Sequence, residues 1–262
     1  MLLTISIPTY NRIEFLKELL PEMVKQCKPY PEVEILIRDN DSRDGTWSYI
    51  RDIERENTNV RAEMNLENVG GDENFVRCVE MARGKYVWLF GDDELLCENG
   101  VANVVSMLKE YPPPLLIMLC CGVTETRNLF WYGKYSEFIK TASPMTIIHH
   151  TLITCNIFRK SSFDTRVARS RSKNLNGSYS HIYAITGDLM GSEGLVVRTN
   201  VPSFKPRPVR APFKQHLKFI RMKWIHLLLY LGVPYHKIVR FAIVDLAFAS
   251  AMRQIHKLGG AA

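Results

Sequence analysis

The sequence predicts an α/β fold: a mostly parallel sheet flanked by helices, with a basic helical extension at the C-terminal end. Three observations carry this prediction. Short β-rich runs alternate with apolar patterns of helical period over residues 1–122. The runs 86–90 and 115–121 have no polar alternation, as expected of strands buried on both faces. Basic residues gather after residue 200, outside the alternating pattern.

The composition of the chain limits the classes of protein to which it can belong. The 262 residues suffice for one large α/β domain with an appendage, and 46% hydrophobic content is typical of a globular protein. The six cysteines lack metal-ligand spacing and indicate reduced thiols in a cytosolic protein. The first residues read as a strand, so we expect no signal peptide. The longest apolar run has ten residues, 224–233, whereas a membrane-spanning helix needs about 20.

The alternating pattern gives each element in order. The expected strands up to residue 122 are 2–7, 33–39, 59–64, 86–90 and 115–121, and the expected helices lie within 13–27, 42–53, 75–82 and 101–108. The pattern beyond is less regular, with strands at 127–133, 152–160 and 194–201 and a short helix and turn at 180–194. The Pro-rich basic stretch 202–212 reads as a linker before two further helices.

Three polar clusters follow predicted strands directly. They are "PTYNR" (8–12), "RDNDSRDGT" (38–46) and "GDDE" (91–94). Ligands of parallel α/β sheets bind outside the carboxyl ends of the strands, so these clusters predict one site. Asp39 suits a nucleobase or ribose hydroxyl, and Arg12 with backbone amides suits phosphate oxygens. Paired carboxylates suit Mg²⁺ or Mn²⁺, which would neutralise a departing diphosphate.

The motifs also carry a family resemblance. "ISIPTYNR", "IRDNDSRDGT" and "NVGGDENFVRCVEMARGKYVWLFGDDELL" resemble the ordered landmarks of family 2 glycosyltransferases, which have the GT-A fold, over residues 2–120. The wording "ENFVRCVEMARGKYVWLFGDDE" is similar to the abequosyltransferase-like subgroup of bacterial surface-polysaccharide sugar transferases. The resemblance implies a nucleotide-sugar donor, a divalent metal and inversion. It divides the chain into a donor half at 1–122, an acceptor half at 123–205 and a basic extension at 206–262.

The resemblance also implies roles for single residues. Asp39 would contact the base, and Asp44 would order the second loop. The residues expected to bind the donor are Pro8, Thr9, Tyr10, Asn11, Arg12, Asp39, Asp44, Asn68, Gly70 and Asp92. Simpler readings stand beside these roles, because Asp residues favour turns and Arg12 suits a solvated helix start.

The acidic cluster departs from the family pattern. Gly91 stands where the family has its first Asp, so Asp93 falls on the metal-binding position and Asp92 reaches toward the ribose or the metal. A second alignment assigns the metal to Asp92 and Glu94 instead, because residues i and i+2 point to one side of a strand. A simpler reading has all three acids cap a helix that begins near Leu95.

The acceptor half must supply a general base if the reaction inverts. The acidic pair usual in the family is missing between 160 and 189. His181 stands at a comparable place, flanked by Asp164 and Asp188, and these three are the candidates for catalysis. A half-buried structural His is the plainer reading of His181.

The basic tail explains the net charge. Residues 201–262 contain eleven Lys or Arg and one Asp, a net +10 against −3 for the remainder. Apolar residues at helical spacing accompany them, which suits helices packed on the domain or lying in an anionic membrane surface. We therefore expect a cytoplasmic protein, peripheral on the inner face of the cytoplasmic membrane.

These observations together predict a metal-dependent glycosyltransferase. Its donor would be a UDP, GDP, CDP or dTDP sugar, and its acceptor a saccharide or lipid-linked saccharide of surface polysaccharide or glycoconjugate synthesis. A nucleotidyltransferase of similar fold is an alternative, although "PTYNR" lacks the glycine-rich loop that such an enzyme needs. A basic nucleic-acid-binding protein is another, but the tail has no recognition motif, and we expect no nucleic-acid partner.

Overall fold

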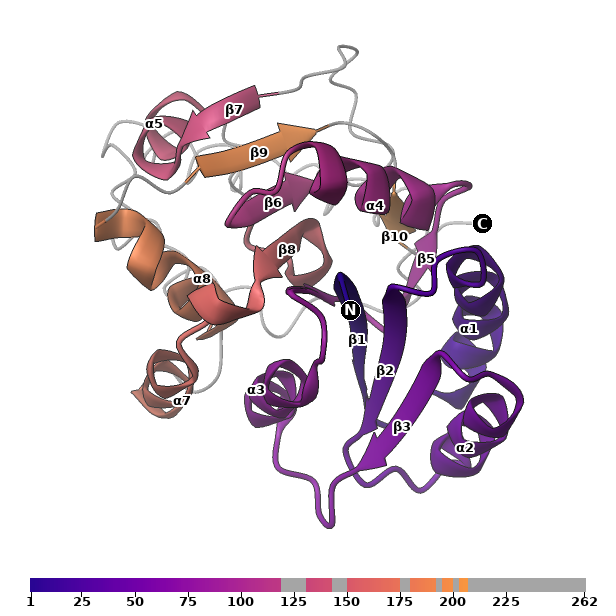
Figure 1. The fold of residues 1–262 in the computed structure, drawn as a ribbon. Helices are drawn as coiled ribbons and strands as arrows, with labels where there is room; N and C mark the ends of the chain where they lie inside the picture. The colour runs from indigo at the N-terminus through magenta and orange to yellow at the C-terminus, as the bar shows by residue number, and fades with distance from the viewer. Residues whose placement is uncertain (119–130, 143–149, 175–179, 192–194, 200–202, 207–262) are drawn as a thin grey trace, which may run out of the picture.

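The structure is a computed structural model that describes residues 1–118, 131–142, 150–174, 180–191, 195–199 and 203–206. The predicted basic extension lies outside the described residues, apart from Pro206. Strands and helices alternate in the first part of the chain (Figure 1). The elements are β1 Leu3–Thr9, α1 Ile13–Cys27, β2 Val33–Asp39, α2 Thr46–Glu56, β3 Val60–Met64, α3 Gly71–Met81 and β4 Tyr86–Leu89.

The second part is less regular, as its sequence predicts. It begins with β5 Glu94–Leu96, α4 Gly100–Glu110, β6 Leu115–Met118, β7 Trp131–Lys134 and α5 Tyr135–Thr141. It continues with two short 3₁₀ helices, η1 Ile153–Cys155 and η2 Lys160–Ser162, on either side of β8 Asn156–Arg159. Its last elements are α7 Thr165–Asn174, α8 Ser180–Gly191, β9 Leu195–Thr199 and β10 Phe204–Pro206.

Eight strands form one sheet in the order β3-β2-β1-β4-β8-β6-β9-β7. The four pairs β3–β2, β2–β1, β1–β4 and β6–β9 are parallel. Strand β8 runs antiparallel between β4 and β6, and β7 runs antiparallel at the edge beside β9. The expected mostly parallel sheet is therefore confirmed.

Helices cover both faces of this sheet, and each face has its own hydrophobic core. One core joins α1, α2 and α4 to Ile5, Trp88 and Phe90. The other joins α3, α5 and α8 to Val87 and Leu89. Alternate residues of β4 thus enter opposite cores, which explains why this strand has no polar positions. Figure 1 shows α1 and α2 on one side of β1–β3 and α3 on the other.

Two expectations are wrong in detail. No helix begins near Leu95: residues 94–96 form β5, and α4 begins at Gly100. The acids at 92–94 therefore do not cap a helix. The linker expected at 202–212 contains a strand instead, because Phe204–Pro206 pairs antiparallel with β5. Phe204 is fully buried and packs edge-on against Phe90, which holds Phe204–Pro206 against the domain.

Candidate functional site

Three loops meet at the carboxyl edge of the central strands. Thr9 at the end of β1 is in register with Asp39 at the end of β2, and Ser6 of β1 is paired with Leu89 of β4. The backbone continues this pairing beyond the strands, because Phe90 N donates to Ser6 O at 2.9 Å and Asn40 N donates to Thr9 O at 2.9 Å. The loops that carry the three polar clusters therefore begin side by side.

The loops after β1 and β2 are joined by side chains. Asp44 accepts hydrogen bonds from Ile13 N at 3.1 Å, Thr46 N at 3.0 Å and Thr46 Oγ1 at 2.6 Å. Asn11, whose φ of 53° is left-handed, donates its backbone N–H to Ser42 Oγ at 2.7 Å. These contacts order both loops before any ligand binds. Pro8 and Thr9 are buried in β1, whereas Tyr10, Asn11 and Arg12 are exposed.

Asp39 is buried at the end of β2. Ser42 donates to it from its hydroxyl at 2.5 Å and from its backbone N–H at 3.3 Å. Burial raises the pKa of the Asp39 carboxyl, and the bonds from Ser42 oppose that shift. This carboxylate is therefore preorganised by the loop that follows it.

Asn40 connects this edge to the loop between β3 and α3, which carries Asn68 and Gly70. Its Nδ2 donates to Asn68 Oδ1 at 2.8 Å, and its Oδ1 accepts from Val69 N at 3.0 Å and Asn65 Nδ2 at 2.8 Å. Asn68 Oδ1 also accepts from Gly70 N at 2.9 Å, where φ is 82°. The buried Asn40 thus fixes a loop whose own residues are exposed.

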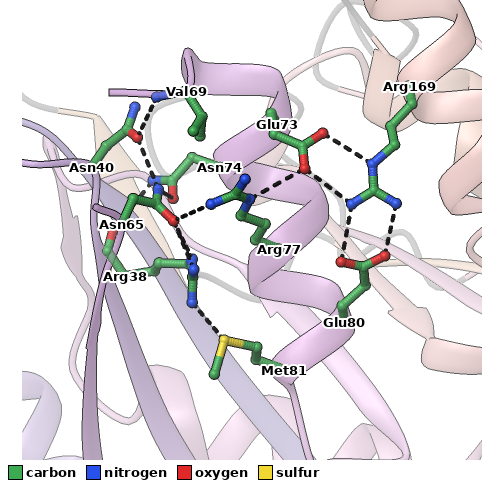
Figure 2. A network of polar contacts seen from close by, with 10 residues as sticks. All are labelled: Arg38, Asn40, Asn65, Val69, Glu73, Asn74, Arg77, Glu80, Met81 and Arg169. Carbon is green, nitrogen blue, oxygen red and sulfur yellow. Dashed lines mark hydrogen bonds and ion pairs between the residues drawn. The ribbon is translucent and has the colours of Figure 1, made fainter. Parts of the chain in front are cut away.

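The network extends from Asn65 into α3 (Figure 2). Asn65 Oδ1 accepts from Arg38 Nε at 3.1 Å, Arg38 Nη2 at 2.6 Å and Arg77 Nη1 at 2.9 Å. Arg77 also pairs with Glu73 at 3.2 Å. Arg169 of α7 then bridges Glu73 at 3.0 Å and Glu80 at 2.8 Å. A continuous polar chain therefore links the β2 edge to α7.

The acidic loop after β4 faces the loop after β1. Thr9 Oγ1 donates to Asp92 Oδ2 at 2.8 Å, and Arg12 Nε lies 4.0 Å from Asp92 Oδ1. Burial raises the pKa of Asp92 to about 6 against these contacts. Burial likewise raises the pKa of Glu94 to about 7, and the nearby Thr154 hydroxyl opposes that shift. Asp93 between them is exposed.

These carboxylates fit a hard divalent cation. Within the described ranges no three His, Cys, Asp or Glu residues form a metal cage. Mg²⁺ needs no such cage, because it is usually held by one or two carboxylates together with waters and substrate phosphates. Glu94 Oε2 is buried and has no hydrogen-bond partner in the described part of the chain. One exposed and one buried carboxylate oxygen are thus available.

Gly91 leaves room for this arrangement. A Cβ at position 91 would lie 3.2 Å from Asp93 Oδ1 and 3.3 Å from Thr154 Oγ1, tighter than ordinary van der Waals contact. A side chain at position 91 would therefore require the Asp93 or Thr154 side chain to shift by a few tenths of an ångström.

The candidate bases have different surroundings. His181 is buried at the start of α8, where its Nε2 donates to Thr151 O at 3.2 Å. Burial lowers its pKa to about 4, so the ring is neutral at pH 7, and Nδ1 has no partner among the described residues. Asp164 accepts from Arg166 N at 2.9 Å and Val167 N at 3.2 Å, and so caps α7. Asp188 lies in α8.

Sequence reasoning missed Asn40, Asn65 and Thr154. Asn65 directly follows β3, so it is a fourth polar residue at a strand end and could have been found by that rule. Thr154 gives no such signal, because it reaches the acidic loop from 63 residues away in sequence.

Comparison with known proteins identifies relatives of this chain. The family model described as Glycosyl transferase family 2 matches residues 4–167. The abequosyltransferase RfbV of Salmonella typhimurium is 31% identical over 193 residues, which are 71% of this chain and 52% of that protein. Further curated relatives are matched over 37% and 45% of their length. The chain therefore spans about half or less of the length of these relatives.

Solved structures share the fold at low sequence identity. The Staphylococcus aureus TarS 1-349 structure in complex with UDP-GlcNAc has a TM-score of 0.60 and 16% identity, covering 88% of this chain and 66% of that one. The mannosyltransferase PcManGT from Pyrobaculum calidifontis, in complex with GDP-Man and Mn²⁺, has a TM-score of 0.61 and 17% identity, covering 99% and 79%. The fold is GT-A.

Proposed function

Because this chain belongs to glycosyl transferase family 2, we propose that it moves a sugar from a nucleotide-diphosphate sugar to a saccharide or lipid-linked saccharide. The observation that carries the proposal is the contact of the acidic loop with the loop after β1, where Thr9 Oγ1 donates to Asp92 at 2.8 Å. This contact gathers carboxylates and Arg12 at the strand edge where α/β proteins bind nucleotides.

For the donor we propose that Asp39 binds the base and that Arg12 meets the diphosphate. Asp39 is buried and held by Ser42. A carboxylate fixed in one orientation in this way is suited to recognise the flat edge of a base. Arg12 is exposed and its Nε lies 4.0 Å from Asp92 Oδ1, so its guanidinium stands at the acidic loop where a diphosphate would accompany the metal. Asn68 and Gly70 would complete the donor site on the loop that Asn40 fixes.

Asp93 and Glu94 would hold a divalent cation, Mn²⁺ or Mg²⁺, with Asp92 beside them. When bound, the cation would neutralise charge on the departing diphosphate. Asp93 is the exposed member of the cluster, and Glu94 Oε2 has no hydrogen-bond partner among the residues that the structure describes, which suits both carboxylates to take a ligand. The solved PcManGT structure holds Mn²⁺, which supports the choice of metal.

We propose His181 as the group that accepts the acceptor proton in an inverting transfer. Its ring is neutral at pH 7 because burial lowers its pKa to about 4. The bond from Nε2 to Thr151 O places the proton on Nε2 and leaves Nδ1, which is buried and has no partner among the described residues, as the atom that can take a proton. Asp164 is engaged in capping α7, so it is the weaker candidate.

The biological role we propose is bacterial surface polysaccharide or glycoconjugate synthesis, by analogy with the named relative. No helix in the described residues has the length and apolar character to cross a bilayer. A peripheral position at an anionic membrane surface would instead use the net +10 charge of residues 201–262.

The test is a thermal-shift panel of UDP-, GDP-, CDP- and dTDP-sugars with and without Mn²⁺. We expect one nucleotide to stabilise the wild type only with metal. Asp93→Ala should abolish that response and transfer while leaving the unfolding temperature of the free protein unchanged. Asp52→Ala removes a carboxylate on α2 that pairs only with Arg55, and should behave as the wild type. A fully active Asp93→Ala would sink the assignment.

A further inference from the structure

Thr154 lies beneath the acidic loop, although it belongs to a distant part of the chain. It is the central residue of η1, just before β8, and its side chain is fully buried. Strand β8 pairs antiparallel with β4, so η1 sits next to the point where β4 leads into Gly91. The topology of the sheet therefore brings Thr154 to the acidic cluster.

Two hydrogen bonds fasten Thr154 to β4 and its loop. Trp88 Nε1 donates to the Thr154 backbone carbonyl at 2.8 Å. The Gly91 N–H donates to Thr154 Oγ1 at 2.8 Å. The Glu94 side chain lies beside the same hydroxyl, because a Cβ at position 91 would be 3.3 Å from Thr154 Oγ1 and 3.5 Å from Glu94 Cγ. A hydroxyl that accepts from Gly91 N keeps its own proton to donate toward this carboxylate.

We propose that Thr154 is a positioning residue that sets the geometry of the Gly91–Glu94 loop for metal and donor binding. This inference rests on the proposed function and deepens it. The Thr154 hydroxyl holds the Gly91 N–H at the start of the loop, and Glu94 N donates to Gly91 O at 3.3 Å, so the end of the loop is fastened to its start. With both ends held, the exposed Asp93 is left to project from the middle.

Aromatic packing holds the strand that leads into Gly91, next to the Thr154 hydroxyl. Phe90, which precedes Gly91, is held by edge-on contacts with Trp88 at 5.0 Å and Phe204 at 6.2 Å between ring centroids. These ring contacts hold the end of the strand that leads into Gly91. Thr154→Val keeps the shape of the side chain but leaves the Gly91 N–H without its partner.

Thr186 provides a matched control. It is also fully buried, and its hydroxyl donates only to Ile182 O of the same helix at 2.7 Å. Thr186→Val therefore makes the same chemical change in a place remote from the acidic loop. Thr154→Ser restores the hydroxyl and should rescue whatever Thr154→Val loses.

Two readouts that need no turnover test the proposal on the full chain. The first is hydrogen exchange of the Gly91 amide, which we expect to become at least about tenfold faster in Thr154→Val, near wild type in Thr154→Ser and unchanged in Thr186→Val. The second is the affinity for Mn²⁺ alone, followed by the paramagnetic resonance of free Mn²⁺. We expect Thr154→Val to bind about tenfold more weakly and the other two variants to bind as the wild type does.

The outcomes separate this inference from the proposed function. If the wild type binds Mn²⁺ and Thr154→Val binds it equally well, the positioning role is overturned and the proposed function stands. Unchanged exchange of the Gly91 amide in Thr154→Val also overturns it. If the wild type binds neither Mn²⁺ nor any nucleotide sugar, the proposed function fails, and the positioning role that rests on it fails too.

Discussion

Two carboxyls of the acidic loop retain protons at unusually high pH. Burial raises the pKa of Asp92 from 3.8 to about 6 and that of Glu94 from 4.5 to about 7. Thr9 and Arg12 favour the ionised form of Asp92, and Thr154 favours that of Glu94, whereas the charge of Asp93 opposes both. Burial is the larger effect in each case. The folded protein thus keeps a costly pair of half-buried acids at the edge of its sheet, as sites for cations do.

Mn²⁺ binding should therefore depend on pH. The folded state holds more protons than the unfolded chain between about pH 4 and pH 7, so these two groups stabilise the fold at low pH, and that stability is lost as pH rises through the window. A cation binds the ionised form and must displace the protons. We expect the Mn²⁺-induced rise in unfolding temperature to be larger at about pH 8 than at about pH 5.5. A rise that is equal at both values, measured by scanning calorimetry, would contradict this linkage.

At the scale of elements, the loop between β3 and α3 is held in place by a side chain from another segment of the chain. Its residues Leu66, Glu67 and Asn68 are exposed, and Leu66 is 98% accessible. Asn40 supplies the contacts that hold the loop, and Asn65 and Asn74 complete the buried network behind it (Figure 2). A loop that contributes little to the core keeps one conformation in this way, at the position where we propose that the donor binds.

Substitutions of Asn40 and Asn74 should distinguish an effect on the position of the β3–α3 loop from an effect on the stability of the fold. In Asn40→Asp the carboxylate still accepts from Val69 N but faces Asn68 Oδ1 without a proton to donate. In Asn74→Asp the donor to Arg38 O is lost within the same network. Each change should lower the free energy of unfolding by about 1–3 kcal/mol.

Only Asn40→Asp should also raise the donor KM, by about tenfold. Thermal unfolding and steady-state kinetics on the pair check this, and equal effects on KM would show a structural role alone.

The elements of the first half were predictable because each is specified locally. Strands β1, β2 and β4 are short β-rich runs, and the polar residues that follow them mark the candidate site by position alone. The antiparallel insertion of β8 and the pairing of β10 with β5 were not predictable, because they depend on contacts between segments far apart in sequence. Thr154 was missed for the same reason, whereas Asp44 lies in a motif that carries the family resemblance.

At the scale of the whole molecule, charge is divided between two parts. Residues 1–200 carry a net charge of −3, and 201–262 carry +10. Strand β10 ties the beginning of the basic segment to β5, next to the acidic loop. An extension that binds an anionic surface would therefore bring the proposed active site close to that surface. A lipid-linked acceptor would be presented there at high local concentration.

Vesicle binding tests this arrangement. We expect the full chain to sediment with vesicles that contain phosphatidylglycerol, to release in high salt, and to ignore phosphatidylcholine. Changing Lys214, Lys218 and Arg221 to Gln should weaken binding by about 100-fold, at about 1 kcal/mol per cation.

The matched control changes Lys17, Lys25 and Arg55, which are exposed on α1 and α2, and should have no effect on vesicle binding.

Competition by RNA, added at the same total negative charge as the vesicles, tests the alternative that the basic segment binds nucleic acid. If RNA displaces the protein from the vesicles, and its binding falls steeply with salt, the basic segment is a nucleic-acid surface. Retention on vesicles instead fits a segment in which Trp224 and Phe241 accompany the cations, because aromatic side chains add apolar burial that a phosphate backbone cannot offer.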